Sequence, residues 1–280
     1  MPRPEPARLT FAGHLFVFVL HLLPHHLLGR LMHVVTRSEW PPIKDWLIRQ
    51  VITRFQVDLS TALEPDPAAY PSFNAFFTRA LRAGARPIDG DPDAVCCPAD
   101  GEVSETGTVT DGRLIQAKGW DYTLLELLGG DGRLAADFDA GAYATIYLSP
   151  RDYHRVHAPL ACELASVRWI PGELRSVAPK VLLRVPRLFA TNERAVLALD
   201  TPLGRAYLVM VGALNVGRIR VVGVETGKSP AKPLTFARGA ELARFELGST
   251  VVLVVPRARA LAGLGPESAL RLGQRLAELP

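Results

Sequence analysis

The sequence predicts an α+β protein in which a helical, membrane-associating region over residues 1–80 precedes a β-rich domain over residues 81–280. Apolar residues before residue 81 recur at helical spacing. From about residue 86, short apolar runs alternate with Gly, Pro and Asp, as expected of strands joined by turns. The 280 residues are 48% hydrophobic and 21% charged, which is enough apolar surface for a packed core.

The first apolar run, FAGHLFVFVLHLL at 11–23, ends at Pro24, and a second, LLGRLMHVV, covers 27–35. Neither reaches the roughly 18–20 apolar residues that a membrane-spanning helix needs. No small-residue cleavage site follows, which argues against a secretory signal peptide. Two interpretations remain: a helix packed on the protein's own core, or a helix lying in the membrane interface. The flanking cations favour the second interpretation.

Two further helices are predicted before the β-rich part. Residues 43–55 carry apolar side chains on one helical face, and residues 72–81 form another short helix. The stretch 56–71 contains three prolines and is predicted as a loop. The aromatic cluster FNAFF at 73–77 is either buried in the core or a second, weaker membrane anchor.

Strands are predicted where short apolar runs lie between turn residues. These segments are AVCCPADGEVSETGTVTDGRLIQA from residue 94, AYATIYLSP from 142, RAYLVMVGALNVGRIRVVGVE from 205 and STVVLVVP from 249. The sequence contains no internal repeat and no low-complexity tract.

Charge and cysteine content restrict the partners and the compartment. The net charge of +4 is too small to indicate nucleic-acid binding, but it is compatible with an anionic membrane surface. Residues 1–60 contain seven cations and four anions, so most of the excess positive charge lies in the helical region. Three cysteines without framework spacing argue against a disulfide scaffold and for a reducing compartment.

Three groups in the β-rich part could carry chemistry. Asp100 stands in a predicted turn, His154 and His157 are three residues apart, and Ser249 follows Gly248 at the start of a strongly β-forming run. Each has an ordinary structural interpretation when taken alone. The histidine pair lacks a third ligand at a suitable spacing, so no metal site is predicted.

Taken together, the three groups fit nucleophilic catalysis. An aspartate can orient a histidine, and the histidine can take the proton of a serine. Gly248 leaves the preceding carbonyl sterically open and tolerates a strained backbone. The Ser249 hydroxyl could therefore attack a separate substrate, as in a serine hydrolase, or its own preceding peptide bond.

Over nearly its whole length the chain resembles the bacterial phosphatidylserine decarboxylase proenzymes, a family of pyruvoyl-dependent enzymes. The Leu-Gly-Ser-Thr and Tyr-His-Arg-Val-His segments are the most specific of the similar stretches, and all occur in family order. These stretches are YPSFNAFFTRALRAGARPID at 70–89, CPADGEVSETG at 97–107, QAKGWDYTLLELL at 116–128, RDYHRVHAPL at 151–160, LFATNERAVL at 188–197, VGALNVGRI at 211–219, ARFELGSTVV at 243–252 and LRLGQRLA at 270–277.

The resemblance implies self-cleavage between Gly248 and Ser249. His157, oriented by Asp100, would take the Ser249 proton, and Ser249 would become a covalent pyruvoyl cofactor. The products would be a large chain 1–248 and a small chain 249–280, which remain together as a heterodimer; further dimerisation is left open. The pyruvoyl ketone would then act as the electron sink for decarboxylation of phosphatidylserine to phosphatidylethanolamine in phospholipid biosynthesis. His154 would assist decarboxylation or the return of the proton.

The resemblance also implies a peripheral location at the cytoplasmic side of the cell membrane. Four positions depart from the family pattern: Arg175, Ala178, Arg218 and Ala243. Arg175 and Ala178 bear on head-group specificity, because the family often has an aromatic residue and an asparagine there. Two other hypotheses stay open at this point: a serine hydrolase that uses Asp100, His157 and Ser249, and a non-enzymatic membrane-associated β-protein.

Overall fold

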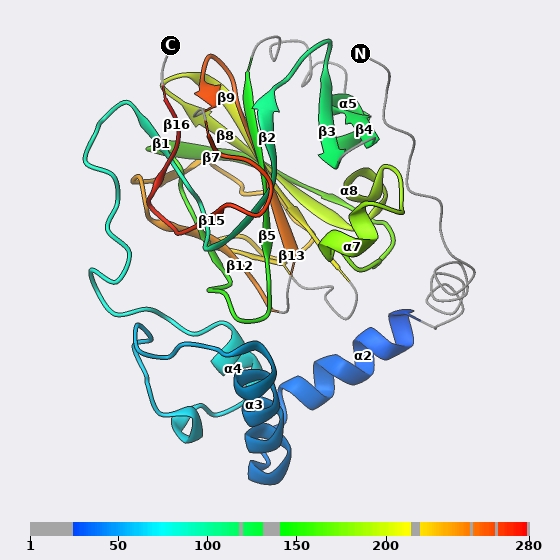
Figure 1. The fold of residues 1–280 in the computed structure, drawn as a ribbon, viewed down its shortest axis with the longest axis vertical. Helices are drawn as coiled ribbons and strands as arrows, with labels where there is room; N and C mark the ends of the chain where they lie inside the picture. The colour runs from blue at the N-terminus through cyan, green and yellow to red at the C-terminus, as the bar shows by residue number, and fades with distance from the viewer. Residues whose placement is uncertain are drawn as a thin grey trace.

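A computed structural model describes the chain over residues 25–117, 120–130, 141–213, 219–246, 249–260 and 263–278. The helices at the N-terminal end lie below a larger body made mainly of strands (Figure 1). This arrangement confirms the predicted mixed fold with a β-rich body. The apolar run at 11–23, predicted as a helix, lies outside the described residues.

The longer helices are at the N-terminal end, and the helical elements of the body are short. They are α2 (His25–Thr36), α3 (Pro41–Phe55), η1 (Pro67–Ala69), α4 (Phe73–Phe77), α5 (Leu124–Leu127), α7 (Pro179–Leu182) and α8 (Leu188–Thr191). The helix predicted over 43–55 is α3, which starts slightly earlier because Pro41 and Pro42 are tolerated in a first turn. The helix predicted over 72–81 is shorter: α4 is capped by the Ser72 side chain and ends at Phe77.

The N-terminal helices have a small core of their own and an exposed apolar side. Ile48, Phe76 and Phe77 are buried in a cluster with other residues of α3 and α4. Of the two interpretations of FNAFF, burial in the core and a weaker membrane anchor, the structure supports burial in the core. In contrast, Trp40 and Trp46 remain 62% and 56% exposed.

The strands form one large sheet and three small ones, and every strand pair for which a register is resolved is antiparallel. The eight-stranded sheet has the order β11-β7-β8-β9-β13-β5-β2-β15, and the small sheets are β10-β12-β6, β1-β16-β14 and β3-β4. The strands are β1 (Ala94–Cys96), β2 (Gly101–Thr108), β3 (Arg113–Ala117), β4 (Trp120–Thr123), β5 (Ala142–Leu148), β6 (Arg155–His157), β7 (Cys162–Ile170), β8 (Arg194–Thr201), β9 (Gly204–Val211), β10 (Ile219–Val221), β11 (Leu234–Phe236), β12 (Glu241–Phe245), β13 (Ser249–Val255), β14 (Arg259–Ala260), β15 (Ala269–Leu270) and β16 (Arg275–Glu278).

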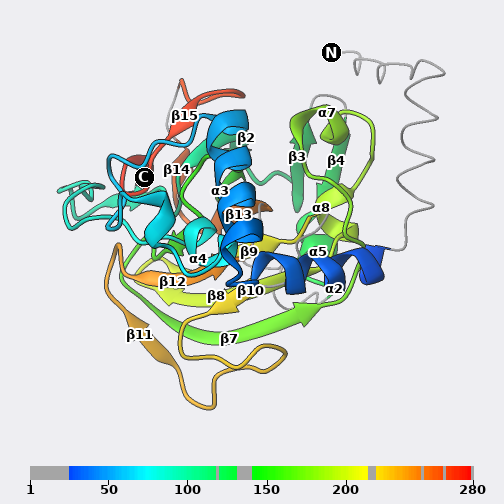
Figure 2. The same cartoon turned by 90° about the horizontal axis from the view of Figure 1, so that it is seen from below.

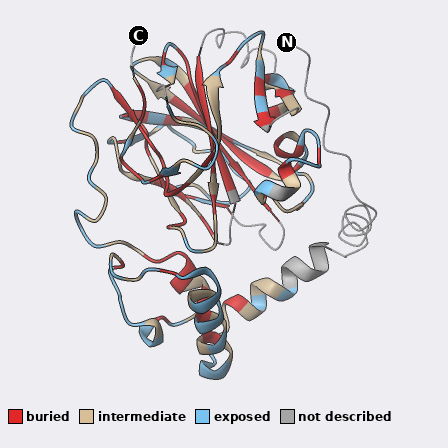
Figure 3. Ribbon diagram, in the orientation of Figure 1, coloured by how far each residue is buried: buried red, intermediate tan, exposed pale blue. Residues whose placement is uncertain are grey.

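The large sheet is buried on both faces around β13. Along β13, Val251 and Leu253 belong to one hydrophobic cluster, while Val252 and Val254 belong to another. This alternation is expected because successive side chains of a strand point to opposite faces. The buried residues accordingly concentrate in the central strands (Figure 3).

The helical region contacts the segment that contains the two histidines through hydrogen bonds and ring packing. The Arg79 guanidinium donates a hydrogen bond to the Arg151 carbonyl oxygen at 2.9 Å, and Arg155 donates to the Thr78 carbonyl oxygen at 3.0 Å. The Phe77 ring packs on the His154 ring with centroids 4.0 Å apart. Seen from below, α2, α3 and α4 lie over one end of the sheets (Figure 2).

Among the described residues, no helix combines the length and the apolar character required to cross a membrane. The three cysteines are free and buried.

Gly101, at the start of β2, allows the chain to pass close to β5. A Cβ atom at this position would lie 2.4 Å from the Tyr147 carbonyl oxygen, so Gly101→Ala should force the two strands apart. We expect a loss of about 2 kcal/mol of unfolding free energy. Gly90→Ala is the matched control, because its Cβ would meet nothing within 4 Å. Thermal unfolding of the two variants checks this; equal midpoints would contradict the packing argument.

Candidate active site

Asp100 occupies the turn between β1 and β2, as the sequence predicted. Its carboxylate is buried and accepts hydrogen bonds from Arg86 Nε at 2.9 and 3.0 Å and from Arg86 Nη2 at 2.5 Å. It also accepts the Leu272 backbone N–H at 2.9 Å. Such a charge-assisted, forked contact holds the carboxylate in one orientation. The same hydrogen bonds raise the pKa of Arg86, so its guanidinium stays protonated.

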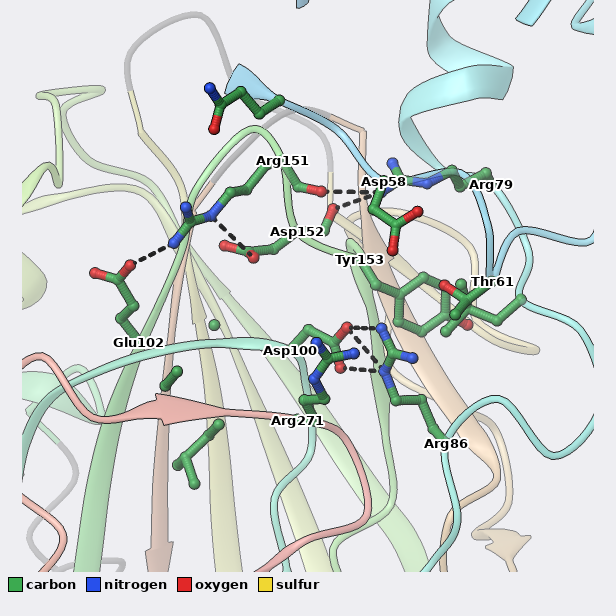
Figure 4. A pocket seen from close by; sticks show the side chains of 15 residues that line it. Asp58, Thr61, Arg79, Arg86, Asp100, Glu102, Arg151, Asp152, Tyr153 and Arg271 are labelled. Carbon is green, nitrogen blue, oxygen red and sulfur yellow. Dashed lines mark hydrogen bonds and ion pairs between the residues drawn. The ribbon is translucent and has the colours of Figure 1, made fainter. Parts of the chain in front are cut away.

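A cavity of about 220 Å³ opens beside this ion pair, between the helical region and the body (Figure 4). Its charged lining residues carry both signs, and several of them are paired with one another. They are Asp58, Arg79, Arg86, Asp100, Glu102, Arg151, Asp152 and Arg271. Tyr153 also lines the cavity and brings it next to the histidine motif.

His154 is fully buried. Its Nδ1–H donates to the Asp152 carbonyl oxygen at 2.8 Å, since a carbonyl can only accept. The other ring nitrogen, Nε2, is buried without a hydrogen-bond partner. Burial lowers the pKa of His154 to about 3. His154 is therefore a neutral imidazole with an unprotonated Nε2.

His157, in β6, is also held as a neutral imidazole. Its Nδ1–H donates to the Gly239 carbonyl oxygen at 2.8 Å, and its Nε2 lies 3.1 Å from the Tyr153 hydroxyl, which acts as the donor. Burial lowers the pKa of His157. Burial also raises the pKa of Tyr153 to about 12, so the tyrosine keeps its proton near neutral pH.

The direct contact between Asp100 and His157 that the sequence analysis expected is absent from the described geometry. Asp100 is engaged by Arg86, whereas His157 is engaged by Gly239 and Tyr153. The two segments still meet, because the His157 backbone N–H donates to the Pro98 carbonyl oxygen at 2.8 Å. The guanidinium is the stronger partner for a carboxylate, which explains why Asp100 turns toward Arg86.

Ser249 is the first residue of β13 and lies opposite Leu148 of β5 in the register. Gly248, the other half of the expected cleavage site, lies outside the described residues. The preceding strand β12 pairs with β6, and the Phe245 N–H donates to the His154 carbonyl oxygen at 3.0 Å. The histidine motif and the strand that leads to Ser249 are therefore direct neighbours.

The residues that depart from the family pattern are placed in different parts of the fold. Arg175 is tied to the end of β9 through Asn192, whose Nδ2 donates to the Arg175 and Gly212 carbonyl oxygens, both at 2.8 Å. Ala178 precedes the first turn of α7. Ala243 is buried in β12, and Arg218 lies outside the described residues.

Arg86, Tyr153 and Gly239 were not predicted from the sequence. Tyr153 belongs to the same motif as the histidines, so its spacing of four residues from His157 was a usable signal. Arg86 and Gly239 are distant in sequence from their partners, and no local pattern marks them. Within the described residues, no group of three or more His, Cys, Asp or Glu side chains is arranged to hold a metal ion.

Comparison with known proteins assigns the chain to a family. The family model described as Phosphatidylserine decarboxylase matches residues 73–278, and a second model, PSD, matches residues 15–56. The chain belongs to the phosphatidylserine decarboxylase family, whose members convert phosphatidylserine to phosphatidylethanolamine.

Curated relatives carry the name phosphatidylserine decarboxylase proenzyme. One from Xanthomonas axonopodis pv. citri (strain 306) is 48% identical over 270 residues, covering 92% of this chain and 96% of the relative. One from Alkalilimnicola ehrlichii (strain ATCC BAA-1101 / DSM 17681 / MLHE-1) is 49% identical, covering 87% of this chain and 88% of the relative. One from Pseudomonas aeruginosa (strain LESB58) is 46% identical, covering 96% and 98%.

The buried His154 should make stability depend on pH. Its pKa is about 3 in the folded chain and near 6.5 when unfolded, so its contribution is complete above pH 6.5 and is lost as the pH falls. Between pH 7 and pH 5 the loss should be about 2 kcal/mol. Urea unfolding of the Ser249→Ala variant and of the His154→Gln/Ser249→Ala double variant at pH 7 and pH 5 measures this loss of unfolding free energy. We expect the variant that lacks His154 to lose less unfolding free energy; equal losses would contradict a buried, neutral His154.

Proposed function

We propose that this chain is a proenzyme that cleaves itself between Gly248 and Ser249 and then decarboxylates phosphatidylserine to phosphatidylethanolamine. The observation that carries the proposal is the convergence of the Asp100 turn, the histidine motif and the strand leading to Ser249 in a member of this family. His157 and His154 are both held neutral there, as bases must be.

In the self-cleavage step, His157 takes the Ser249 hydroxyl proton while the Ser249 oxygen attacks the Gly248 carbonyl carbon. The peptide C–N bond breaks, the Ser249 nitrogen gains a proton, and an ester replaces the amide. β-Elimination then leaves a carboxylate on Gly248 and a dehydroalanine at position 249. Water replaces the nitrogen of the dehydroalanine, ammonia leaves, and a pyruvoyl group remains. The products are chains 1–248 and 249–280, which we propose stay together as a heterodimer.

Orientation of His157 is assigned to Gly239 and Tyr153, which contact both of its ring nitrogens. For this reaction Nε2 must be the nitrogen that takes the proton, because Nδ1 already carries one. The Tyr153 hydroxyl must then release Nε2 or pass the Ser249 proton to it. Asp100 acts from a greater distance: its negative charge favours the protonated form of His157.

Thr250, the residue after the proposed pyruvoyl position, has a buried hydroxyl oxygen without a hydrogen-bond partner. A pyruvoyl group supplies a ketone that forms a covalent bond with the substrate amine and accepts electrons as carbon dioxide leaves. We assign to His154 the task of holding or returning a proton at the substrate α-carbon, because its Nε2 is buried and free.

A peripheral location on the cytoplasmic side of the cell membrane agrees with the surface of the N-terminal helices. Large apolar side chains are exposed on α2, on α3 and in the loops that flank α3, and such side chains enter the interface between lipid and water. They are Leu31, Val34, Trp40, Trp46, Phe55 and Leu63. These helices lie at one end of the molecule, so they could dock while the site remains beside the membrane (Figure 1).

Replacing Trp46 with glutamate should weaken membrane binding, because it removes an exposed indole and adds a negative charge. We expect affinity for vesicles of phosphatidylserine and phosphatidylcholine to fall by about tenfold or more. Ile115→Glu is the matched control, since Ile115 is 48% exposed on β3, at the end of the body away from the helices (Figure 1). Vesicle co-sedimentation measures the affinity of both variants. An equal loss of vesicle affinity in Trp46→Glu and Ile115→Glu would contradict a docking role for α3.

The proposed chemistry is tested by carbon dioxide release from phosphatidylserine vesicles before and after borohydride treatment. We expect release by the purified protein and its loss after reduction, because borohydride converts the ketone to an alcohol. Ser249→Ala should remain uncleaved and release no carbon dioxide. A borohydride-resistant activity, or an active Ser249→Ala protein, would contradict the pyruvoyl assignment. An intact chain that hydrolyses esters would indicate the serine hydrolase instead.

A further inference from the structure

The cleavage site lies in a short crossing between two sheets. β12 ends at Phe245 in the small sheet, and β13 begins at Ser249 in the large sheet. Phe245 is buried and hydrogen-bonded to the His154 carbonyl oxygen. On the other side, Thr250 is buried and lies opposite both Tyr147 and Val211 in the register. Both ends of the crossing are therefore fixed, and only residues 246–248 connect them.

Glu246 begins this crossing, and two arginines bind its carboxylate. Arg37, directly after α2, forms an ion pair and a hydrogen bond with Oε2. Arg220 of β10 approaches Oε1 at 3.4 Å. The Glu246 side chain is only 12% exposed, so solvent screens this contact less than a surface ion pair. The carboxylate therefore links the N-terminal region to the residues just before Ser249.

Arg37 belongs to the part of the chain that presents apolar side chains to solvent. On α2, Leu31 is 58% exposed and Val34 is 69% exposed, and the Arg37 guanidinium also contacts the His33 ring. The contact with Glu246 spans 209 positions of sequence. An element suited to a membrane surface is thus attached by a charge pair to the crossing that carries the reacting bond.

We propose that Arg37 and Glu246 are a positioning pair that holds Glu246, three residues before Ser249, and thereby sets the rate of self-cleavage. The inference rests on the proposed function. Attack by the Ser249 hydroxyl requires the Gly248 carbonyl at close range and in a narrow orientation, and small displacements of such groups slow reactions strongly. Neither residue touches the reacting atoms; they act through the placement of the backbone between them and Ser249.

The test follows cleavage of the full-length chain during cell-free synthesis, with the precursor and the 1–248 chain separated on a denaturing gel. We expect Arg37→Ala to slow cleavage about tenfold, which corresponds to about 1.4 kcal/mol of activation free energy. Arg37→Lys should restore most of the rate, since lysine keeps the charge that Glu246 binds. The matched control is Arg54→Ala, which removes the same charge from the exposed last turn of α3.

A double-mutant cycle separates positioning from general destabilisation. Arg37→Ala should slow cleavage in the native background but have no further effect once Glu246→Ala is present. The Ser249→Ala precursor supplies the folding control: in it, Arg37→Ala and Arg54→Ala should have similar thermal midpoints.

Two results would contradict the positioning role of Arg37 and Glu246. The first is a wild-type cleavage rate in the Arg37→Ala variant. The second is equal slowing by Arg37→Ala in the native and in the Glu246→Ala background. A wild-type chain that never cleaves would overturn the proposed function itself, and the inference with it. The two failures are thus told apart by the wild-type lane of the same gel.

Discussion

The hydrogen-bonded register of β13 is the constraint on which the rest of the site depends. β13 is paired along its length with β5 and along most of its length with β9, and both of its faces are buried. A slip of one residue would move every side chain to the opposite face, so the register is strongly determined. Ser249 is therefore held at the first position of a strand with a fixed register. The proposed self-cleavage then requires mainly that the residues before Ser249 and the histidines lie close to that point.

Burying the two histidines has a cost in stability that the helical region helps to offset. Burial keeps both imidazoles neutral, and His154 leaves one ring nitrogen unsatisfied. Phe77 covers His154, and the backbone around the motif receives hydrogen bonds from Arg79 and Arg155. The N-terminal region is thus a structural part of the site as well as a candidate membrane contact.

Much of the fold could be predicted from local sequence. The period of apolar residues located α3, and turn residues around Asp100 separated two strands, because both signals arise within a few residues of chain. The site was only partly predictable. The residues could be nominated from motif resemblance, yet the pairing of Asp100 with Arg86 and of His157 with Gly239 depends on segments far apart in sequence. The role of the aromatic cluster at 73–77 was also not predictable from local sequence. Its composition fits either a core or a membrane anchor, and only the burial of its side chains distinguishes the two.

The proposed self-processing cuts the bond between Gly248 and Ser249 and removes the nitrogen of Ser249. Intact mass measurement of the purified wild-type protein under denaturing conditions tests it most directly. We expect two chains, 1–248 and 249–280, with the small chain lighter than a serine-led peptide by the mass of ammonia. A single unmodified chain of 30.5 kDa, or a small chain that still begins with serine, would contradict the account.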